Sequence, residues 1–230
     1  MKAVILAGGL GTRISEESVT RPKPMIEIGG KPIIWHIMKM YASHGITDFI
    51  ICAGYKGYMI KEYFFNYFLH QTDIEIKLKS NSCTFMKSQS EDWTVKIIDT
   101  GSSTQTGGRL KRVREYLDDE PFCFTYGDGV GDIDITATLE KYNSSNALAL
   151  LTSYAPPNRF GILETEHDKV INFSEKPKSS DAMINAGFFV LSPEVINLIE
   201  GDNSIWEDYP LNQLASNGDL IFHEHQGFWQ

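Results

Sequence analysis

Short apolar runs alternate with segments of helical periodicity through the first 70 residues. Ala3–Leu6 and Phe49–Cys52 are uninterrupted apolar runs, which are typical of strands buried on both faces. Between them, from Pro32 to Gly45, apolar positions recur at helical spacing, and Ile60–Leu69 indicates a second helix. This order of elements predicts a parallel sheet covered by helices.

The pattern changes between Asp73 and Asp99. Ile74, Ile76 and Leu78 alternate with charged residues, and residues 95–98 also favour an extended chain. We expect a small antiparallel excursion near residues 73–99 that projects from the body. This excursion could be a self-contained flap or a surface that contacts another subunit, and the sequence does not decide between them.

The rest of the chain continues as a mixture of helices and short strands. The pattern predicts helices at 108–117, 134–142, 193–199 and 211–217, and strands at 122–126, 147–153, 160–164, 170–174, 186–191 and 220–225. No segment has the composition of a flexible linker or a repeat. We therefore expect one α/β domain over residues 1–230, with a mostly parallel central sheet flanked by helices.

Composition narrows the choice of partner and compartment. Among 230 residues, 30 are Asp or Glu and 21 are Lys or Arg, and this net charge of −9 argues against nucleic acid or an anionic membrane as the main partner. No apolar run approaches the ~18 residues that cross a bilayer. The three cysteines, Cys52, Cys83 and Cys123, lack disulfide or metal-site spacing, so we expect a reducing, cytoplasmic compartment.

The segment after the first strand carries the most chemical information. Leu6-Ala7-Gly8-Gly9-Leu10-Gly11-Thr12-Arg13 follows a buried strand, which places it at a carboxyl end of the sheet, where open α/β folds bind ligands. Its glycines let backbone N–H groups approach phosphate oxygens, while Arg13 and Lys23 add positive charge. The plainer alternative is a turn that binds nothing. The dinucleotide fingerprint fails at Ile14, and no Gly-Lys-Ser/Thr occurs.

Several motifs together resemble those of a known family. LAGGLGTR, RPKPM and GGKPIIWHIM, followed by TGGRLKR, YGDG, RFG, EKP, NAGFF and GFWQ, closely resemble the sugar-1-phosphate nucleotidyltransferases. The combination of TGGRLKR with GFWQ is narrower and resembles the cytidylyltransferases among them. The resemblance covers essentially the whole chain. It implies a Rossmann-like fold, one nucleotidyltransferase domain, Mg²⁺ as cofactor, and CTP and α-D-glucose 1-phosphate as substrates.

The resemblance also assigns roles to individual residues. It implies that a sugar-phosphate oxygen attacks the α-phosphorus of CTP and releases pyrophosphate. The implied catalytic residues are Arg13, Lys23 and Asp128, with Lys23 at the α-phosphate and Asp128 as the metal ligand. The implied nucleotide contacts are Leu6, Ala7, Gly8, Gly9, Leu10, Gly11, Thr12, Arg13, Lys23, Thr104, Gly108 and Arg109, and the implied sugar-phosphate contacts are Gly161, Glu175, Lys176 and Asn185.

Each assignment has a plainer alternative. Asp128, between two glycines, can be a turn residue that bonds its own backbone. The basic residues of Arg109–Arg114 can form a solvated helix face, and Glu175–Lys176 can be an ordinary exposed pair. Asp132 and Asp134 follow closely, and we expect them to be a turn residue and a helix cap.

The sequence departs from the family at its carboxyl end. In the family, a second acidic residue follows a GFWQ-like segment and completes the metal site, whereas this sequence stops at Gln230. Either the natural chain continues, or the metal site is incomplete and binds Mg²⁺ weakly. A sibling thymidylyl- or uridylyltransferase and an inactive sugar-nucleotide-binding module therefore remain alternatives. The resemblance also implies a homo-oligomer.

Overall fold

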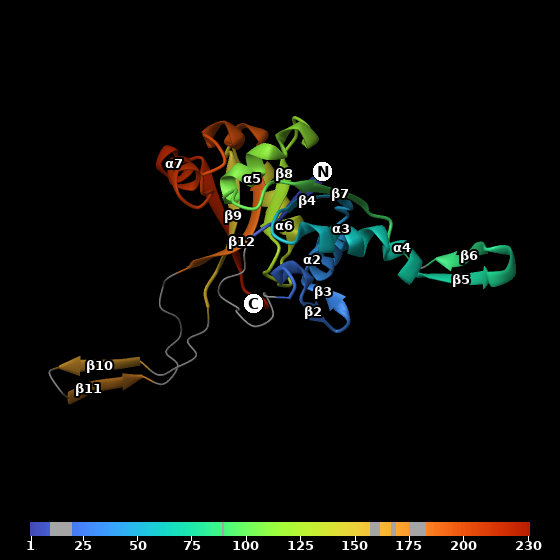
Figure 1. The fold of residues 1–230 in the computed structure, drawn as a ribbon. Helices are drawn as coiled ribbons and strands as arrows, with labels where there is room; N and C mark the ends of the chain where they lie inside the picture. Colours follow the sequence, from blue (N-terminus) through green and yellow to red (C-terminus); the bar gives the residue numbers. More distant parts are fainter. Residues whose placement is uncertain (10–19, 89, 157–161, 167–168, 175–182) are drawn as a thin grey trace.

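The computed structural model describes residues 1–9, 20–88, 90–156, 162–166, 169–174 and 183–230. Within them, a seven-stranded sheet has the order β13-β9-β12-β8-β1-β4-β7 (Figure 1). β12 runs antiparallel to β8 and β9, and the other neighbours are parallel, as predicted. The strands are β1 (Lys2–Ala7), β4 (Asp48–Ala53), β7 (Thr94–Asp99), β8 (Phe122–Tyr126), β9 (Ala149–Tyr154), β12 (Ile184–Leu191) and β13 (Leu220–His225).

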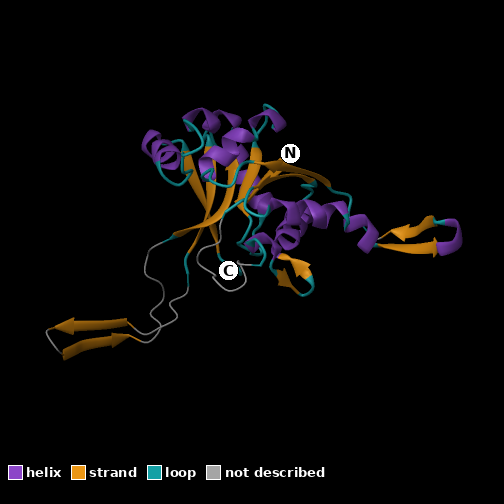
Figure 2. Cartoon of the chain, in the orientation of Figure 1, coloured by secondary structure: helices purple, strands orange, loops and turns teal. Residues whose placement is uncertain are grey.

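Helices cover both faces of this sheet (Figure 2). One face packs against α2 (Ile33–Ser43), α3 (Gly57–Phe65) and α6 (Ile135–Asn143). The other packs against α5 (Thr106–Arg112), α7 (Tyr209–Asn217) and a 3₁₀ helix over Pro193–Leu198. Shorter helical segments are α4 (Tyr67–His70) and 3₁₀ turns at Lys23–Met25, Leu78–Ser80 and Arg114–Tyr116.

The central strands read as uninterrupted apolar runs because both of their faces are buried. Ala3, Ile5 and Ala7 of β1 belong to the core under α2, whereas Val4 and Leu6 belong to the core under α5. β1 lies between β4 and β8, and the strand order reverses at this point. In open α/β sheets, ligands bind outside the carboxyl ends of the strands at such a reversal.

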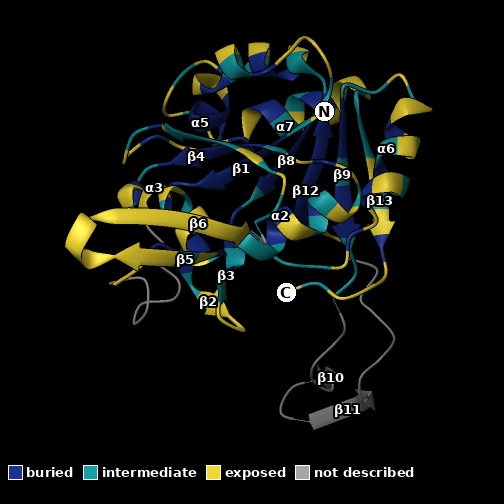
Figure 3. Cartoon of the chain, turned by 90° about the vertical axis from the view of Figure 1, so that its right-hand side faces the viewer, coloured by how far each residue is buried: buried dark blue, intermediate teal, exposed yellow. Residues whose placement is uncertain are grey.

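The predicted antiparallel excursion is confirmed over part of its length. β5 (Thr72–Lys77) and β6 (Ser82–Ser88) form an antiparallel pair that projects beyond α4 (Figure 1), and most of its described residues are exposed, although Thr72 is buried (Figure 3). Residues 94–99 were wrongly included in it, because they form β7, which pairs in parallel with β4. As the edge strand, β7 is only partly buried, so its apolar positions resemble those of a hairpin.

Two predicted helices differ from the structure at their ends. The helix predicted at 60–69 is divided at Asn66 into α3 and α4. The helix predicted at 108–117 begins two residues earlier, at Thr106, and ends at Arg112. Two further antiparallel pairs are β2 (Glu27–Ile28) with β3 (Lys31–Pro32), and β10 (Ile162–Glu166) with β11 (Lys169–Ser174).

In the part of the chain that the structure describes, every helix is too short or too polar to cross a lipid bilayer. The cysteines are free: Cys52 and Cys123 are buried in the sheet, and Cys83 is exposed on β6. Burial raises the pKa of the Cys52 and Cys123 thiols to about 12, so neither is a reactive thiolate at neutral pH.

Candidate active site

A cavity of about 290 Å³ opens at the carboxyl ends of β1 and β8. The described residues among the predicted nucleotide contacts meet in its lining, with the exception of Gly108. The lining residues are Leu6, Ala7, Gly8, Gly9, Lys23, Pro24, Thr104, Gln105, Thr106, Arg109, Tyr126 and Asp128. The end of β1, the glycine turn at Gly8 and Gly9, and the start of α5 thus form one concave surface.

Lys23 and Asp128 face each other in this cavity. Lys23 begins a 3₁₀ turn between Pro22 and Pro24, and the two proline rings restrict the backbone on either side of it. Its Nζ lies 3.4 Å from Asp128 Oδ2, and the two side chains are 17% and 46% exposed. An ion pair this open to solvent contributes little to folding stability. Both groups therefore remain available to a ligand.

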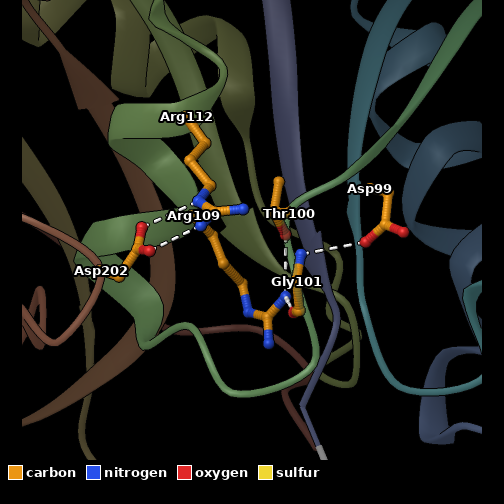
Figure 4. A network of polar contacts seen from close by, with 6 residues as sticks. All are labelled: Asp99, Thr100, Gly101, Arg109, Arg112 and Asp202. Carbon is orange, nitrogen blue, oxygen red and sulfur yellow. Dashed lines mark hydrogen bonds and ion pairs between the residues drawn. The ribbon is translucent and has the colours of Figure 1, made fainter.

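Arg109 points into the protein and binds backbone oxygens. Its side chain is buried, and its NH2 group donates to Gly8 O at 2.9 Å. Its NH1 group donates to Gly101 O at 2.7 Å and to Thr100 Oγ1 at 2.8 Å (Figure 4). Burial lowers the pKa of the Arg109 guanidinium, but an arginine remains protonated in proteins. Arg109 is therefore a buried cation that fixes the glycine turn, and it does not lie on a solvated helix face.

Gly108 packs against a loop of the other half of the chain. Its nitrogen donates to Ser204 O at 3.1 Å, and a Cβ at this position would lie 2.6 Å from the Cα and the carbonyl oxygen of Asp202. Next to it, Gln105 N donates to Asp202 O at 2.8 Å. The structure thus places Gly108 in a packing contact, and Gly108 is not among the residues that line the cavity.

The other basic residues of α5 hold the same loop. Lys111 Nζ donates to Ile199 O at 2.6 Å and to Glu200 O at 3.0 Å. Arg112 forms two hydrogen bonds with Asp202, Nε to Oδ1 at 2.8 Å and NH2 to Oδ2 at 2.5 Å, and they lower the pKa of the Asp202 carboxyl (Figure 4). Lys111 and Arg112 are therefore exposed residues that also contact the loop, and the alternative of a solvated basic face is wrong for the buried Arg109.

Asn185 lies one contact away from the cavity. Its Oδ1 accepts a hydrogen bond from Gly187 N at 2.8 Å, and Gly187 packs against the ring of Tyr126, which lines the cavity. Thr104 lines the cavity directly and is buried. The other predicted site residues, Leu10, Gly11, Thr12, Arg13, Gly161, Glu175 and Lys176, lie outside the described residues.

Sequence reasoning missed several residues of the lining. Gln105 and Thr106 lie at the N-cap and the first residue of α5, next to the predicted contact Thr104, and Tyr126 precedes the Gly-Asp-Gly turn. Both hydroxyls, of Thr106 and Tyr126, donate to the carboxylate of Glu207. The Tyr-Gly-Asp-Gly motif could have indicated Tyr126, but no local pattern marks Glu207.

The carboxylates suit a cation that is shared with phosphates. Among the described residues, no group of three or more His, Cys, Asp and Glu side chains could hold a metal ion. Mg²⁺ in proteins commonly uses one or two carboxylates together with phosphate oxygens and water. Asp128 fits that role, whereas Asp134 caps α6 by accepting from Ala137 N at 2.9 Å, and Asp132 lies 3.2 Å from His225 Nε2.

Replacing Gly108 with alanine tests the packing contact with Asp202. We expect Gly108→Ala to lower the free energy of unfolding by about 1–3 kcal/mol, because the new methyl group overlaps backbone atoms that cannot move independently. Gly201→Ala, in the same loop, is the matched control, since a Cβ there meets nothing within 4 Å. Urea denaturation measures both. Equal stability of the two variants, with a loss of nucleotide affinity only in Gly108→Ala, would contradict this interpretation.

Comparisons with known proteins agree with this arrangement. A family model described as "Nucleotidyl transferase" matches residues 2–213. The chain is 59% identical over 231 residues to "Glucose-1-phosphate cytidylyltransferase" of Salmonella typhi, covering 100% of this chain and 90% of that protein. It is 43% identical over 230 residues to "Probable glucose-1-phosphate cytidylyltransferase" of Bacillus subtilis (strain 168), with the same coverage.

Solved structures show the same fold. The crystal structure of HddC from Yersinia pseudotuberculosis matches with a TM-score of 0.71 and 24% identity, over 99% of this chain and 92% of that chain. This likeness confirms the Rossmann-like architecture expected from the sequence. Since the family model spans residues 2–213, the chain belongs to the nucleotidyl transferase family.

Proposed function

We propose that this chain transfers the cytidylyl group of CTP to α-D-glucose 1-phosphate, giving CDP-glucose and pyrophosphate. The observation that carries the proposal is the 59% identity, over 231 residues, to the glucose-1-phosphate cytidylyltransferase of Salmonella typhi. The cavity supports it, because it joins a glycine turn, a lysine and a carboxylate at the point where the strand order reverses.

The reaction is a displacement at phosphorus. An oxygen of the sugar phosphate forms a bond to the α-phosphorus of CTP while the bond from that phosphorus to the bridging oxygen breaks, and pyrophosphate leaves with the electron pair. Such transfers need positioning and charge neutralisation more than covalent participation by the protein. Lys23, held between two prolines, would neutralise the α-phosphate as its charge grows.

The glycine turn would receive the triphosphate. Arg109 holds the Gly8 carbonyl on the protein side, and the turn continues into Gly9 at the cavity. The proposal keeps Leu10, Gly11, Thr12 and Arg13 as triphosphate contacts on the family resemblance. On the same basis it keeps Gly161, Glu175, Lys176 and Asn185 as contacts of the sugar phosphate.

Asp128 would hold a divalent cation, which we propose to be Mg²⁺. Its carboxylate lies in the cavity and is almost half exposed, so it can reach a cation that phosphate oxygens also bind. When bound, such a cation neutralises phosphate charge. Lys23 lies 3.4 Å away, and it would be released from Asp128 to contact the phosphate.

We also propose a homo-oligomer, in which the β5–β6 hairpin contacts another copy. Its apolar side chains are exposed: Leu78 by 87%, Phe85 by 51% and Met86 by 60%. Leaving so much apolar surface in water is unfavourable for a free hairpin, and association would bury it.

Nucleotide selectivity tests the proposed reaction. With α-D-glucose 1-phosphate as acceptor, we expect kcat/KM for CTP to exceed that for UTP, dTTP, GTP or ATP by at least roughly 100-fold, because sites that hydrogen-bond a base discriminate strongly. Pyrophosphate release measures each rate. A preference for dTTP or UTP would identify a sibling transferase, and nucleotide binding without turnover would identify a binding module.

Lys23→Ala tests the role of the cavity lysine. We expect kcat to fall by about 100-fold or more, since the lysine acts on charge that develops during the transfer. Lys31→Ala is the matched control, because the Lys31 ammonium lies over the Trp35 and Tyr67 rings, 5.5 and 5.4 Å from their centroids. Thermal unfolding checks that both variants fold. If kcat of Lys23→Ala equals that of the wild type, Lys23 is not catalytic.

Asp128→Asn tests the metal role. The neutral amide is a weaker ligand, so we expect the Mg²⁺ concentration at half-maximal rate to rise at least roughly tenfold. Asp134→Asn makes the same chemical change at the helix cap, where asparagine also caps well, and should leave the Mg²⁺ dependence unchanged. An unaltered Mg²⁺ titration of Asp128→Asn would remove Asp128 from the site.

A further inference from the structure

Glu207 joins two hydroxyl groups that line the cavity. It lies in the loop before α7, and its two carboxylate oxygens have different partners. Oε1 accepts a hydrogen bond from the Tyr126 hydroxyl, and Oε2 accepts one from Thr106 Oγ1 at 2.7 Å. An ionised carboxylate only accepts hydrogen bonds, so both hydroxyl hydrogens point towards Glu207.

Asn185 is connected to Tyr126 through Gly187. Asn185 Oδ1 accepts a hydrogen bond from Gly187 N at 2.8 Å, and the Tyr126 ring lies against Gly187. Because the amide oxygen is bound to Gly187 N, the NH2 group of Asn185 points away from that nitrogen. Burial and the Glu207 carboxylate raise the pKa of Tyr126, so the hydroxyl keeps its hydrogen.

A break in the register of β12 gives Asn185 its place. The pairing of β12 with β9 shifts between Asn185 and Phe189, and Gly187 adopts a φ of +82°. A Cβ on Gly187 would lie 2.5 Å from Tyr126 Cδ2, so the tyrosine ring packs directly on the glycine. Such irregularities redirect side chains beside active sites. The Tyr126 ring is thus fixed by Gly187 and its hydroxyl by Glu207.

The second branch runs to the start of α5. Thr106 Oγ1 donates to Glu207 and accepts from Trp206 N at 2.8 Å, which uses its single hydrogen and one lone pair. Thr104 and Gln105, just before it, line the cavity. Trp206 is fully buried, and its ring meets Phe124 at 5.8 Å between centroids. Glu207 is therefore attached to a rigid part of the core.

We propose that Glu207 is a positioning residue for both substrates. Through Tyr126, whose ring packs on Gly187, it holds the segment that places Asn185 at the sugar phosphate, and through Thr106 it fixes the start of α5 beside the nucleotide. The inference rests on the proposed function, which supplies Asn185 with its ligand. A Glu207 that served only stability would hold the loop without affecting the KM of either substrate.

Three variants separate the two branches. Tyr126→Phe removes the hydrogen bond by which Glu207 holds the tyrosine ring against Gly187, and Thr106→Val removes the hydrogen bond from Glu207 to the start of α5. Glu207→Gln disturbs both, because an amide offers only one acceptor oxygen. We expect the KM for glucose 1-phosphate to rise roughly tenfold in Tyr126→Phe and Glu207→Gln, and the KM for CTP to rise similarly in Thr106→Val and Glu207→Gln. Glu200→Gln, at an exposed position of the same loop, is the matched control and should change neither KM.

A double variant shows whether Glu207 acts through Tyr126. We expect the KM for glucose 1-phosphate in Tyr126→Phe/Glu207→Gln to equal that in Tyr126→Phe alone, because the second change acts on a link already broken. Additive increases would overturn the proposal. So would a Glu207→Gln protein with a lower Tm and both KM values unchanged.

A second variant and a second substrate cover two cases in which the test of Glu207 would otherwise be ambiguous. If Glu207→Gln fails to fold, Glu207→Asp replaces it, since aspartate keeps the charge on a shorter side chain, and the same KM increases are expected. If the wild-type chain prefers another triphosphate, the proposed function fails. The KM ratios measured with that triphosphate and its sugar phosphate then test Glu207 independently.

Discussion

One buried guanidinium ties together the carboxyl ends of three parallel strands. Arg109 donates to carbonyl oxygens of Gly8, Ala53 and Gly101, which follow or end β1, β4 and β7. Burying a charge is costly unless it is hydrogen-bonded, and these oxygens accept hydrogen bonds from both terminal nitrogens of the guanidinium. Because they are neutral, they leave its positive charge in place beside the cavity. The positive charge of Arg109 attracts a bound triphosphate, and no carboxylate has to leave Arg109 first.

The helix that bears Arg109, α5, also contacts the second half of the chain. α5 presents Arg109 to the sheet, and its Gly108 packs on the backbone of Asp202. The loop held by this contact leads to Glu207, which binds Thr106 and Tyr126. Residues that are distant in sequence therefore form one connected unit. A change in packing at α5 is expected to alter the cavity as well as stability.

The sequence predicted what depends on local pattern and not what depends on long-range contact. The strand ending at Leu6 was predictable because burial on two faces leaves an uninterrupted apolar run. β7 was misassigned, since an edge strand exposes one side and its alternation resembles a hairpin. The packing of Gly108 on Asp202 had no local signal, because the two residues lie far apart along the chain. Glu207 had no signal at all, because its partner Tyr126 is 81 residues away.

An acidic chain can bind a polyanion because local geometry outweighs net charge. Charges farther than about 8 Å away are largely screened at physiological salt, so the net charge of −9 acts weakly at the cavity. What acts there is Arg109, fixed by backbone oxygens, and Lys23, fixed by prolines and paired at 3.4 Å with Asp128. That pair neutralises itself in the free protein. When a triphosphate binds together with a cation, Lys23 can pair with a phosphate and Asp128 with the cation. Both partners carry more charge than the ones they replace, so this exchange needs little reorganisation.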